Sequence, residues 1–134
     1  MSGLVLKLGP GERVLINGAV IENGERRSRL SIVSKNANIL RLRDAIHPEE
    51  ATTPVRRVCY IAQLVLAGDA APDEAQHQIL RGIDQLSQVF VAREWLQVLS
   101  IAGDLVHEKN FYQALKILRR LIPEEDRLMS SGLA

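Results

Sequence analysis

The strongest candidates for chemistry are basic side chains spaced along the first third of the chain. Guanidinium groups on extended segments contact phosphates and stack on unpaired bases, so this pattern favours single-stranded RNA as a ligand. The basic residues that we single out are Arg26, Arg27, Arg29, Lys35, Arg41 and Arg43.

The distribution of charge supports the same interpretation. Residues 1–43 carry eight basic and three acidic side chains, a balance of +5, whereas residues 58–134 carry seven and ten, a balance of −3. The overall formal charge of +1 hides this asymmetry. A polyanionic partner is therefore expected at the N-terminal end.

Alternation along a strand puts Arg27 with Arg29, and Arg41 with Arg43, on single faces. Whether the two pairs share a face depends on strand register, because a slip of one residue inverts a strand. The alternative is that these arginines only keep the outer face of a small sheet solvated. No aromatic ring for base stacking lies within residues 1–43.

The segment that follows extends the candidate RNA-binding set to Arg56, Arg57 and Tyr60. Tyr60 is the aromatic ring nearest to the basic side chains. Its alternative role is that of a tyrosine at the edge of a buried helix, with its hydroxyl in water.

Five short strands are expected before residue 44. Gly9-Pro10-Gly11 indicates a hairpin between the first two, and Asn17-Gly18 indicates a further turn. Asn23-Gly24 predicts a tight turn with positive φ angles. The expected strands cover residues 4–8, 13–17, 20–22, 26–33 and 39–43.

Helices are expected after Thr53-Pro54, an N-cap followed by proline at the first helical position. Apolar periodicity predicts helices over residues 55–67, 72–90 and 93–107. Asn110 has the spacing to cap a last helix, which Pro123 should end. The chain is thus predicted to be α+β: a small antiparallel sheet or barrel-like module (1–43), a linker (44–53), a helical module (54–122) and a tail (123–134), of which residues 129–134 are expected to be frayed.

No motif for catalysis, cofactor binding or metal binding is found. There is no phosphate loop ending in Lys-Ser/Thr and no nucleophile elbow. Cys59 is the only cysteine, which favours a buried structural thiol, and the three histidines lack metal-ligand spacing. Because no catalytic motif is found, a non-enzymatic protein is expected. No apolar run approaches the ~20 residues of a membrane span, so the protein is expected in the cytoplasm.

A protein-binding role is the alternative to RNA binding. Amphipathic helices that carry Phe90, Trp95, Phe111 and Tyr112 would hold a partner helix in a groove. The same four aromatic side chains also fit ordinary core packing. A homodimer that pairs strand edges is a further expectation, because a small sheet leaves edges uncovered.

Several segments resemble the FlbT family of flagellar biosynthesis repressors of alphaproteobacteria. The resemblance covers nearly the whole chain and is carried by residues 10–19, 27–32, 39–46, 53–60 and 112–121. It implies a post-transcriptional regulator that associates with the 5′ untranslated region of flagellin mRNA and promotes its decay. Flagellin and a FlaF-type protein are the protein partners that it implies.

Overall fold

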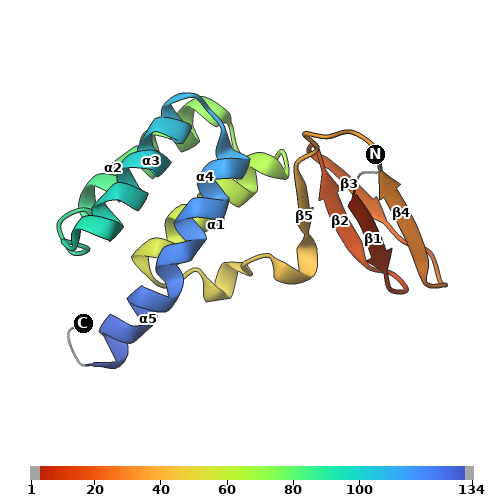
Figure 1. Cartoon of the computed structure of the whole chain (residues 1–134), viewed down its shortest axis with the longest axis horizontal. Helices are drawn as coiled ribbons and strands as arrows, with labels where there is room; N and C mark the ends of the chain where they lie inside the picture. The colour runs from red at the N-terminus through yellow and green to blue at the C-terminus, as the bar shows by residue number, and fades with distance from the viewer. Residues whose placement is uncertain (1–3, 132–134) are drawn as a thin grey trace. The chain divides into compact units, whose positions relative to one another are not determined.

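The chain forms two compact units, residues 1–45 and 46–134, which we call the β unit and the helical unit. The structure is a computed structural model and describes residues 4–131. Strands β1–β5 lie in the β unit and helices α1–α5 in the helical unit (Figure 1). The predicted α+β class is confirmed.

Two small antiparallel sheets make up the β unit. In the first, β1 (Leu4–Leu8) pairs with β4 (Ser28–Ile32). In the second, β2 (Arg13–Ile16) lies between β3 (Ala19–Glu22) and β5 (Ile39–Arg41). Each strand lies within one of the segments expected from the sequence or overlaps it, although β4 and β5 are shorter than predicted.

The predicted hairpin between the first two strands is wrong, because β1 and β2 belong to different sheets. Leu6 and Leu8 of β1 and Val14 of β2 are buried in one apolar cluster, against which Leu30 and Ile39 also pack. Both strands bury leucine or valine side chains in this common core. They can do so because they face one another across the core instead of pairing side by side. Residues 9–12 therefore connect two layers rather than two neighbouring strands.

The tight turn lies at Asn17-Gly18 and not at Asn23-Gly24. Ile16 pairs with Ala19 across a two-residue loop in which Asn17 and Gly18 have φ angles of 51° and 87°. These values fit the primed turn that matches strand twist. The positive φ angles predicted for Asn23-Gly24 are absent, because this segment leads from one sheet to the other.

Strand β3 is an edge strand of its sheet, and all four of its residues are exposed. Val20 is 55% exposed and Ile21 is 37% exposed. The strand is held by its pairing with β2 and by an ion pair between Arg13 and Glu22 of 2.8 Å.

In the helical unit, α1 (Pro54–Leu66) packs against α2 (Pro72–Leu86) and α4 (Phe111–Leu118), and α3 (Arg93–His107) packs against both α2 and α4 (Figure 1). The caps are as predicted: Thr53 Oγ1 accepts from Arg56 N at 3.3 Å, and Asn110 Oδ1 accepts from Gln113 N at 3.2 Å. Short 3₁₀ turns occupy residues 42–44 of the β unit and residues 48–50 and 119–121 of the helical unit.

Residues 129 and 130 of the segment predicted to fray are helical, and Pro123 does not end a helix as predicted. It lies in the first turn of α5 (Ile122–Ser130), where a missing N–H costs no hydrogen bond. Two acidic side chains join α5 to the start of α1. Glu125 Oε2 accepts a hydrogen bond from Val55 N at 2.9 Å, and Asp126 Oδ1 accepts one from Arg56 Nη1. Residues 132–134 of the predicted tail lie outside the described residues.

Cys59 has no solvent exposure, as predicted for a structural thiol. Burial raises its pKa to about 12, which keeps it protonated and unreactive. Within residues 4–131, no helix has the length and apolarity that crossing a bilayer demands. The same residues contain no cluster of three or more His, Cys, Asp or Glu side chains suited to a metal ion.

The close approach of α1 and α2 predicts opposite effects for two Gly→Ala changes. A Cβ on Gly82 would lie 2.4 Å from Val58 Cγ1, so Gly82→Ala should destabilise the protein by about 1–3 kcal/mol. Gly103 of α3 has no atom within 4 Å of its added Cβ. Gly103→Ala should therefore stabilise by about 0.5–1 kcal/mol through helix propensity. Urea unfolding followed by circular dichroism measures both, and equal effects would contradict the packing.

Candidate nucleic-acid interface

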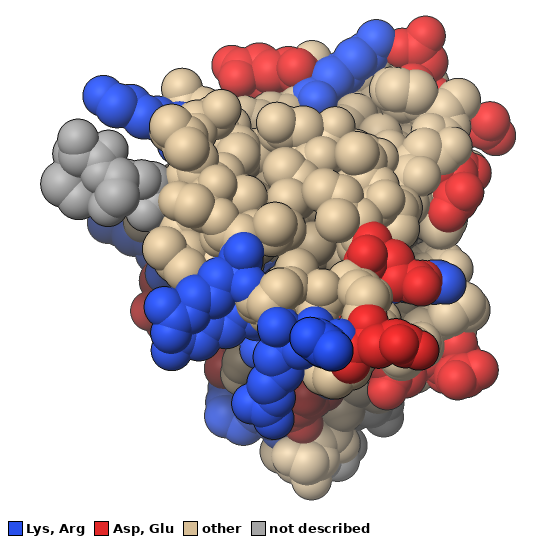
Figure 2. Space-filling view, turned by 90° about the vertical axis from the view of Figure 1, so that its right-hand side faces the viewer, with Lys and Arg blue, Asp and Glu red and all other residues tan. Residues whose placement is uncertain are grey.

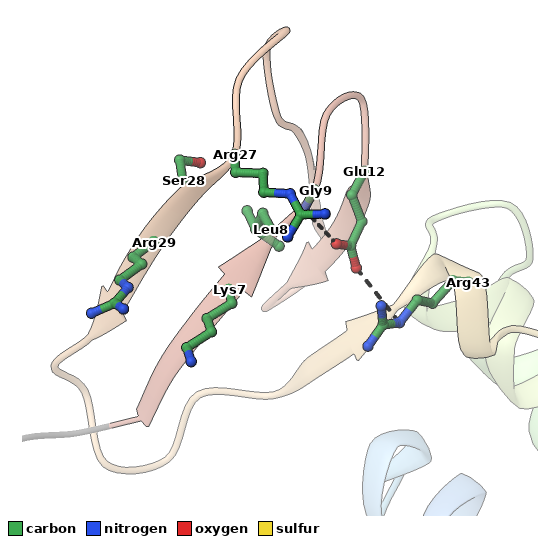
Figure 3. Close-up of a pocket in the computed structure, with 8 residues that line it drawn as sticks. All are labelled: Lys7, Leu8, Gly9, Glu12, Arg27, Ser28, Arg29 and Arg43. Carbon is green, nitrogen blue, oxygen red and sulfur yellow. Dashed lines mark hydrogen bonds and ion pairs between the residues drawn. The ribbon is translucent and has the colours of Figure 1, made fainter.

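A concave site in the β unit gathers four basic side chains from three segments that are far apart in sequence. The concavity has a volume of about 490 Å³ and includes the end of β1 and the start of β4. Figure 3 shows Arg27 reaching over Leu8 and Gly9 toward Glu12. We call this site the basic pocket; its lining residues are Lys7, Leu8, Gly9, Glu12, Arg27, Ser28, Arg29 and Arg43.

Strand pairing positions the first two cations. Lys7 of β1 lies directly opposite Arg29 of β4, so their side chains share a face. The intervening positions, Leu6 and Leu30, point to the apolar cluster on the other face. Period-two alternation therefore separates a basic outer face from an apolar inner face within one two-stranded sheet.

Asn23 fixes the loop that precedes β4 and so helps to position Arg27. Its Nδ2 donates to the carbonyl of Gly9 at 2.7 Å and to that of Arg26 at 2.9 Å. Its Oδ1 accepts from Ser28 Oγ at 2.6 Å. One amide side chain thus joins the end of β1 to the start of β4, where the backbone would otherwise leave carbonyls unpaired.

Glu12 is the only acidic residue that lines the basic pocket. Its Oε1 accepts from Gly9 N at 3.0 Å, and its Oε2 accepts from Arg41 Nε at 2.7 Å. Arg43 Nε lies 3.8 Å away (Figure 3). The Gly9 N–H, with the Arg41 guanidinium second in importance, holds the pKa of Glu12 below its ordinary value, so the carboxylate is charged at neutral pH.

The cations outnumber this carboxylate. Arg41 is occupied, because it also donates from Nη2 to the carbonyl of Lys7 at 2.7 Å. The side chains of Lys7, Arg27 and Arg29 make no ion pair with the described residues, and Arg43 is 62% exposed beside a carboxylate that Arg41 already neutralises. The pocket therefore has positive charge available for an anion.

The structure brings together some of the predicted RNA-binding residues and separates others. Arg27, Arg29 and Arg43 line one pocket. Arg26 and Lys35 are exposed but do not line it. Arg41 does not line it either, and its Nε donates to the lining residue Glu12. The predicted placement of Arg41 and Arg43 on one strand face is wrong, because β5 ends at Arg41 and Arg43 lies in the 3₁₀ turn that follows. β4 and β5 belong to different sheets, so no strand register relates the two arginine pairs.

The three predicted residues of α1 differ among themselves. Arg56 donates to both carboxylate oxygens of Asp126, at 2.7 and 3.0 Å, so its guanidinium is engaged within the helical unit. Arg57 is exposed, and its Nη2 donates to the carbonyl of Thr52 at 3.3 Å. Tyr60 is half-buried, in keeping with the edge-of-helix alternative.

The four aromatic residues predicted for partner binding do not form one exposed face. Phe90 and Phe111 are buried in the helical unit, with 3% and 4% exposure. Trp95 and Tyr112 are half-buried, and the Lys116 ammonium lies 5.6 Å from the centre of the Tyr112 ring. Core packing accounts for the two phenylalanines.

Sequence reasoning missed Lys7, Glu12 and Asn23. The signal for Lys7 was its place between Leu6 and Leu8 in an alternating strand, which puts it on the polar face. Pairing β1 with β4 is needed to bring it to Arg29. Figure 2 looks at the chain from the right-hand side of Figure 1 and shows several lysine and arginine side chains close together in the lower part of that face, with others apart from them at its top and upper left.

Comparisons with known proteins give a consistent result. The family described as flagellar protein FlbT matches residues 4–129. A protein of Brucella anthropi named probable flagellum biosynthesis repressor protein FlbT is 32% identical over 124 residues, 92% of this chain and 80% of that protein. The flagellum biosynthesis repressor protein FlbT of Caulobacter vibrioides is 30% identical over 134 residues, 98% of this chain and 94% of that protein. No solved structure matches the chain.

The interaction between Glu12 and Arg41 predicts an acid-sensitive step in the β unit. The folded pKa of Glu12 is lowered, so its stabilising contribution is complete above the unfolded pKa and is lost as pH falls through the folded pKa. An NMR titration should find the Glu12 carboxyl midpoint below the ordinary value for glutamate. Arg41→Ala should raise it, whereas Arg26→Ala should leave it unchanged. An ordinary midpoint in the unmodified protein would contradict the geometry.

Proposed function

The chain belongs to the FlbT family of flagellar proteins, and we propose that it represses flagellum biosynthesis by binding the 5′ untranslated region of flagellin mRNA and promoting the decay of that message. Its relatives are named flagellum biosynthesis repressors, and these names support the repressor role. The basic pocket of the β unit is the observation that supports RNA as the ligand.

Phosphate groups are the ligands that best fit this pocket. Lys7, Arg27 and Arg29 make no ion pair among the described residues, so an anion would gain their charge without displacing an internal partner. Guanidinium groups bind phosphate through two parallel N–H donors, which adds direction to the attraction. Arg41 is not counted among these contacts, because Glu12 and the Lys7 carbonyl occupy it.

A single-stranded segment suits the pocket better than a regular duplex. The cations converge on a concavity of about 490 Å³ instead of lying along an extended flat face. A flexible strand can bring successive phosphates into such a hollow, and its unstacked bases can lie against guanidinium planes. No aromatic residue lines the pocket, so arginine would supply whatever stacking occurs.

Repression then follows from occupancy and needs no bond-breaking step by the protein. In this proposal the chain acts in the cytoplasm without a cofactor. Binding covers one part of the leader and leaves neighbouring single-stranded elements open to nucleases. The protein supplies affinity and position, and cellular enzymes supply cleavage.

Removing two of the pocket arginines should remove about half of the salt dependence of RNA binding. With about four phosphate contacts, log affinity for a flagellin leader RNA should fall with log salt at a slope of about −3. Arg27→Ala/Arg29→Ala should make that slope shallower by about 1.4, at ~0.7 per contact. Filter binding or fluorescence anisotropy at several salt concentrations measures both slopes.

The matched control is Arg93→Ala/Arg120→Ala, which removes the same charge from exposed positions of the helical unit. This control should bind RNA with the slope of the unmodified protein. If both double variants lose affinity equally, only net charge matters and the pocket is not the site. If the unmodified protein binds no leader RNA at low salt, the alternative of an adaptor that binds flagellin or a FlaF-type protein becomes the leading one.

A further inference from the structure

A second concavity, in the helical unit, is apolar. It has a volume of about 450 Å³ and lies between the end of α2, the connection that follows it, and α5. We call it the apolar groove. Its lining includes Leu86, Val89, Phe90, Leu128 and Met129, together with Glu125.

The rim of this groove exposes apolar side chains that the fold itself does not use. Val89 is 62% exposed and Met129 is 44% exposed, while Leu86 and Phe90 beneath them are buried. Apolar side chains grouped around a hollow mark protein-binding surfaces more often than isolated exposed ones do. Methionine adds a flexible, polarisable contact that adapts to a partner side chain.

Glu125 supplies a polar requirement within the same groove. It is 5% exposed, and its Oε2 accepts from Val55 N at 2.9 Å. Its Oε1 is buried and has no hydrogen-bond donor within the described part of the chain. A buried carboxylate oxygen without a donor is costly, so a cation brought into the groove would offset part of that cost through its charge.

Arg56 does not meet this requirement. Its Nη1 lies 3.7 Å from Glu125 Oε1, which is an ion-pair distance but too long for a hydrogen bond. Both terminal nitrogens of Arg56 instead donate to Asp126, at 2.7 and 3.0 Å. The groove lining contains no lysine or arginine, so its one charged group is the carboxylate.

We propose that the apolar groove binds a segment of a partner protein that presents a large apolar side chain next to a lysine or arginine. The apolar side chain would lie between Val89 and Met129, and the cation would approach Glu125. Charge complementarity excludes RNA, because phosphates would meet a carboxylate and no cation. This site is independent of the basic pocket, and neither requires the other to be correct.

Selection from a random 12-residue peptide library displayed on phage, with the unmodified full chain as bait, tests the proposal. The enriched peptides should pair a large apolar residue with Lys or Arg. Binding of a selected peptide, measured by fluorescence anisotropy, should weaken about tenfold or more in Val89→Asp/Met129→Asp. Leu96→Asp/Ile101→Asp places the same changes at exposed apolar positions of α3 and should bind normally.

The role of Glu125 is tested by a double-mutant cycle. Replacing the basic residue of the peptide by glutamine should weaken binding to the unmodified protein several-fold and have little effect on binding to Glu125→Gln. Glutamine keeps a side-chain oxygen for Val55 N, and thermal unfolding verifies that the variant is folded. The effect of the peptide substitution on binding to the unmodified protein remains informative even if the Glu125→Gln variant does not fold.

Three outcomes would overturn the proposal. The first is no enrichment of apolar–basic peptides, and the second is equal binding to Val89→Asp/Met129→Asp and the unmodified protein. The third is that the unmodified chain sediments as a dimer and that Val89→Asp/Met129→Asp sediments as a monomer. A second copy of the chain would then be the occupant of the groove. Loss of RNA binding in the basic-pocket variant leaves all these measurements unchanged, so the two proposals fail separately.

Discussion

The carboxylate of Glu12 is the contact on which the organisation of the β unit depends. It accepts from Gly9 N and from Arg41, and Arg41 in turn donates to the carbonyl of Lys7. These bonds join β1 of one sheet to β5 of the other, at one end of the shared apolar cluster. The same carboxylate pairs with Arg41 and Arg43, whereas Lys7, Arg27 and Arg29 make no ion pair among the described residues. The Glu12 side chain thus contributes both to the connection between the two sheets and to the charge of the basic pocket.

Local signals in the sequence account for most of the secondary structure. Thr53-Pro54 and Asn110 have the side chains that pair with free N–H groups at helix starts, and Asn17-Gly18 tolerates the φ angles of a tight turn. Pairing of β1 with β4 was not accessible in this way, because it depends on which apolar faces meet in three dimensions. Pro123 was ambiguous, since proline both ends a helix and favours the first turn of the next.

The positive charge of the candidate site could be predicted from the sequence, but the particular residues that form the site could not. Arg27, Arg29 and Arg43 were recognised from their residue type, yet nothing local distinguishes them from Arg26 or Lys35, which stand outside the pocket. Lys7 joins the site only through its register with Arg29. Arg41 shows the converse, because a strong sequence candidate became part of the internal scaffold once Glu12 was near it. Long-range pairing decides which basic residues are free.

The bond between Glu125 and Val55 has a consequence for how the chain is made. The two residues are 70 positions apart, so this contact can form only after residue 125 has left the ribosome. Until then the first turn of α1 lacks the donor–acceptor pair that joins it to α5, and buried side chains of α1 such as Val55 and Val58 lack part of their cover. The β unit, made of residues already synthesised, can fold earlier. Newly made protein can therefore complete its basic surface before α5 joins α1.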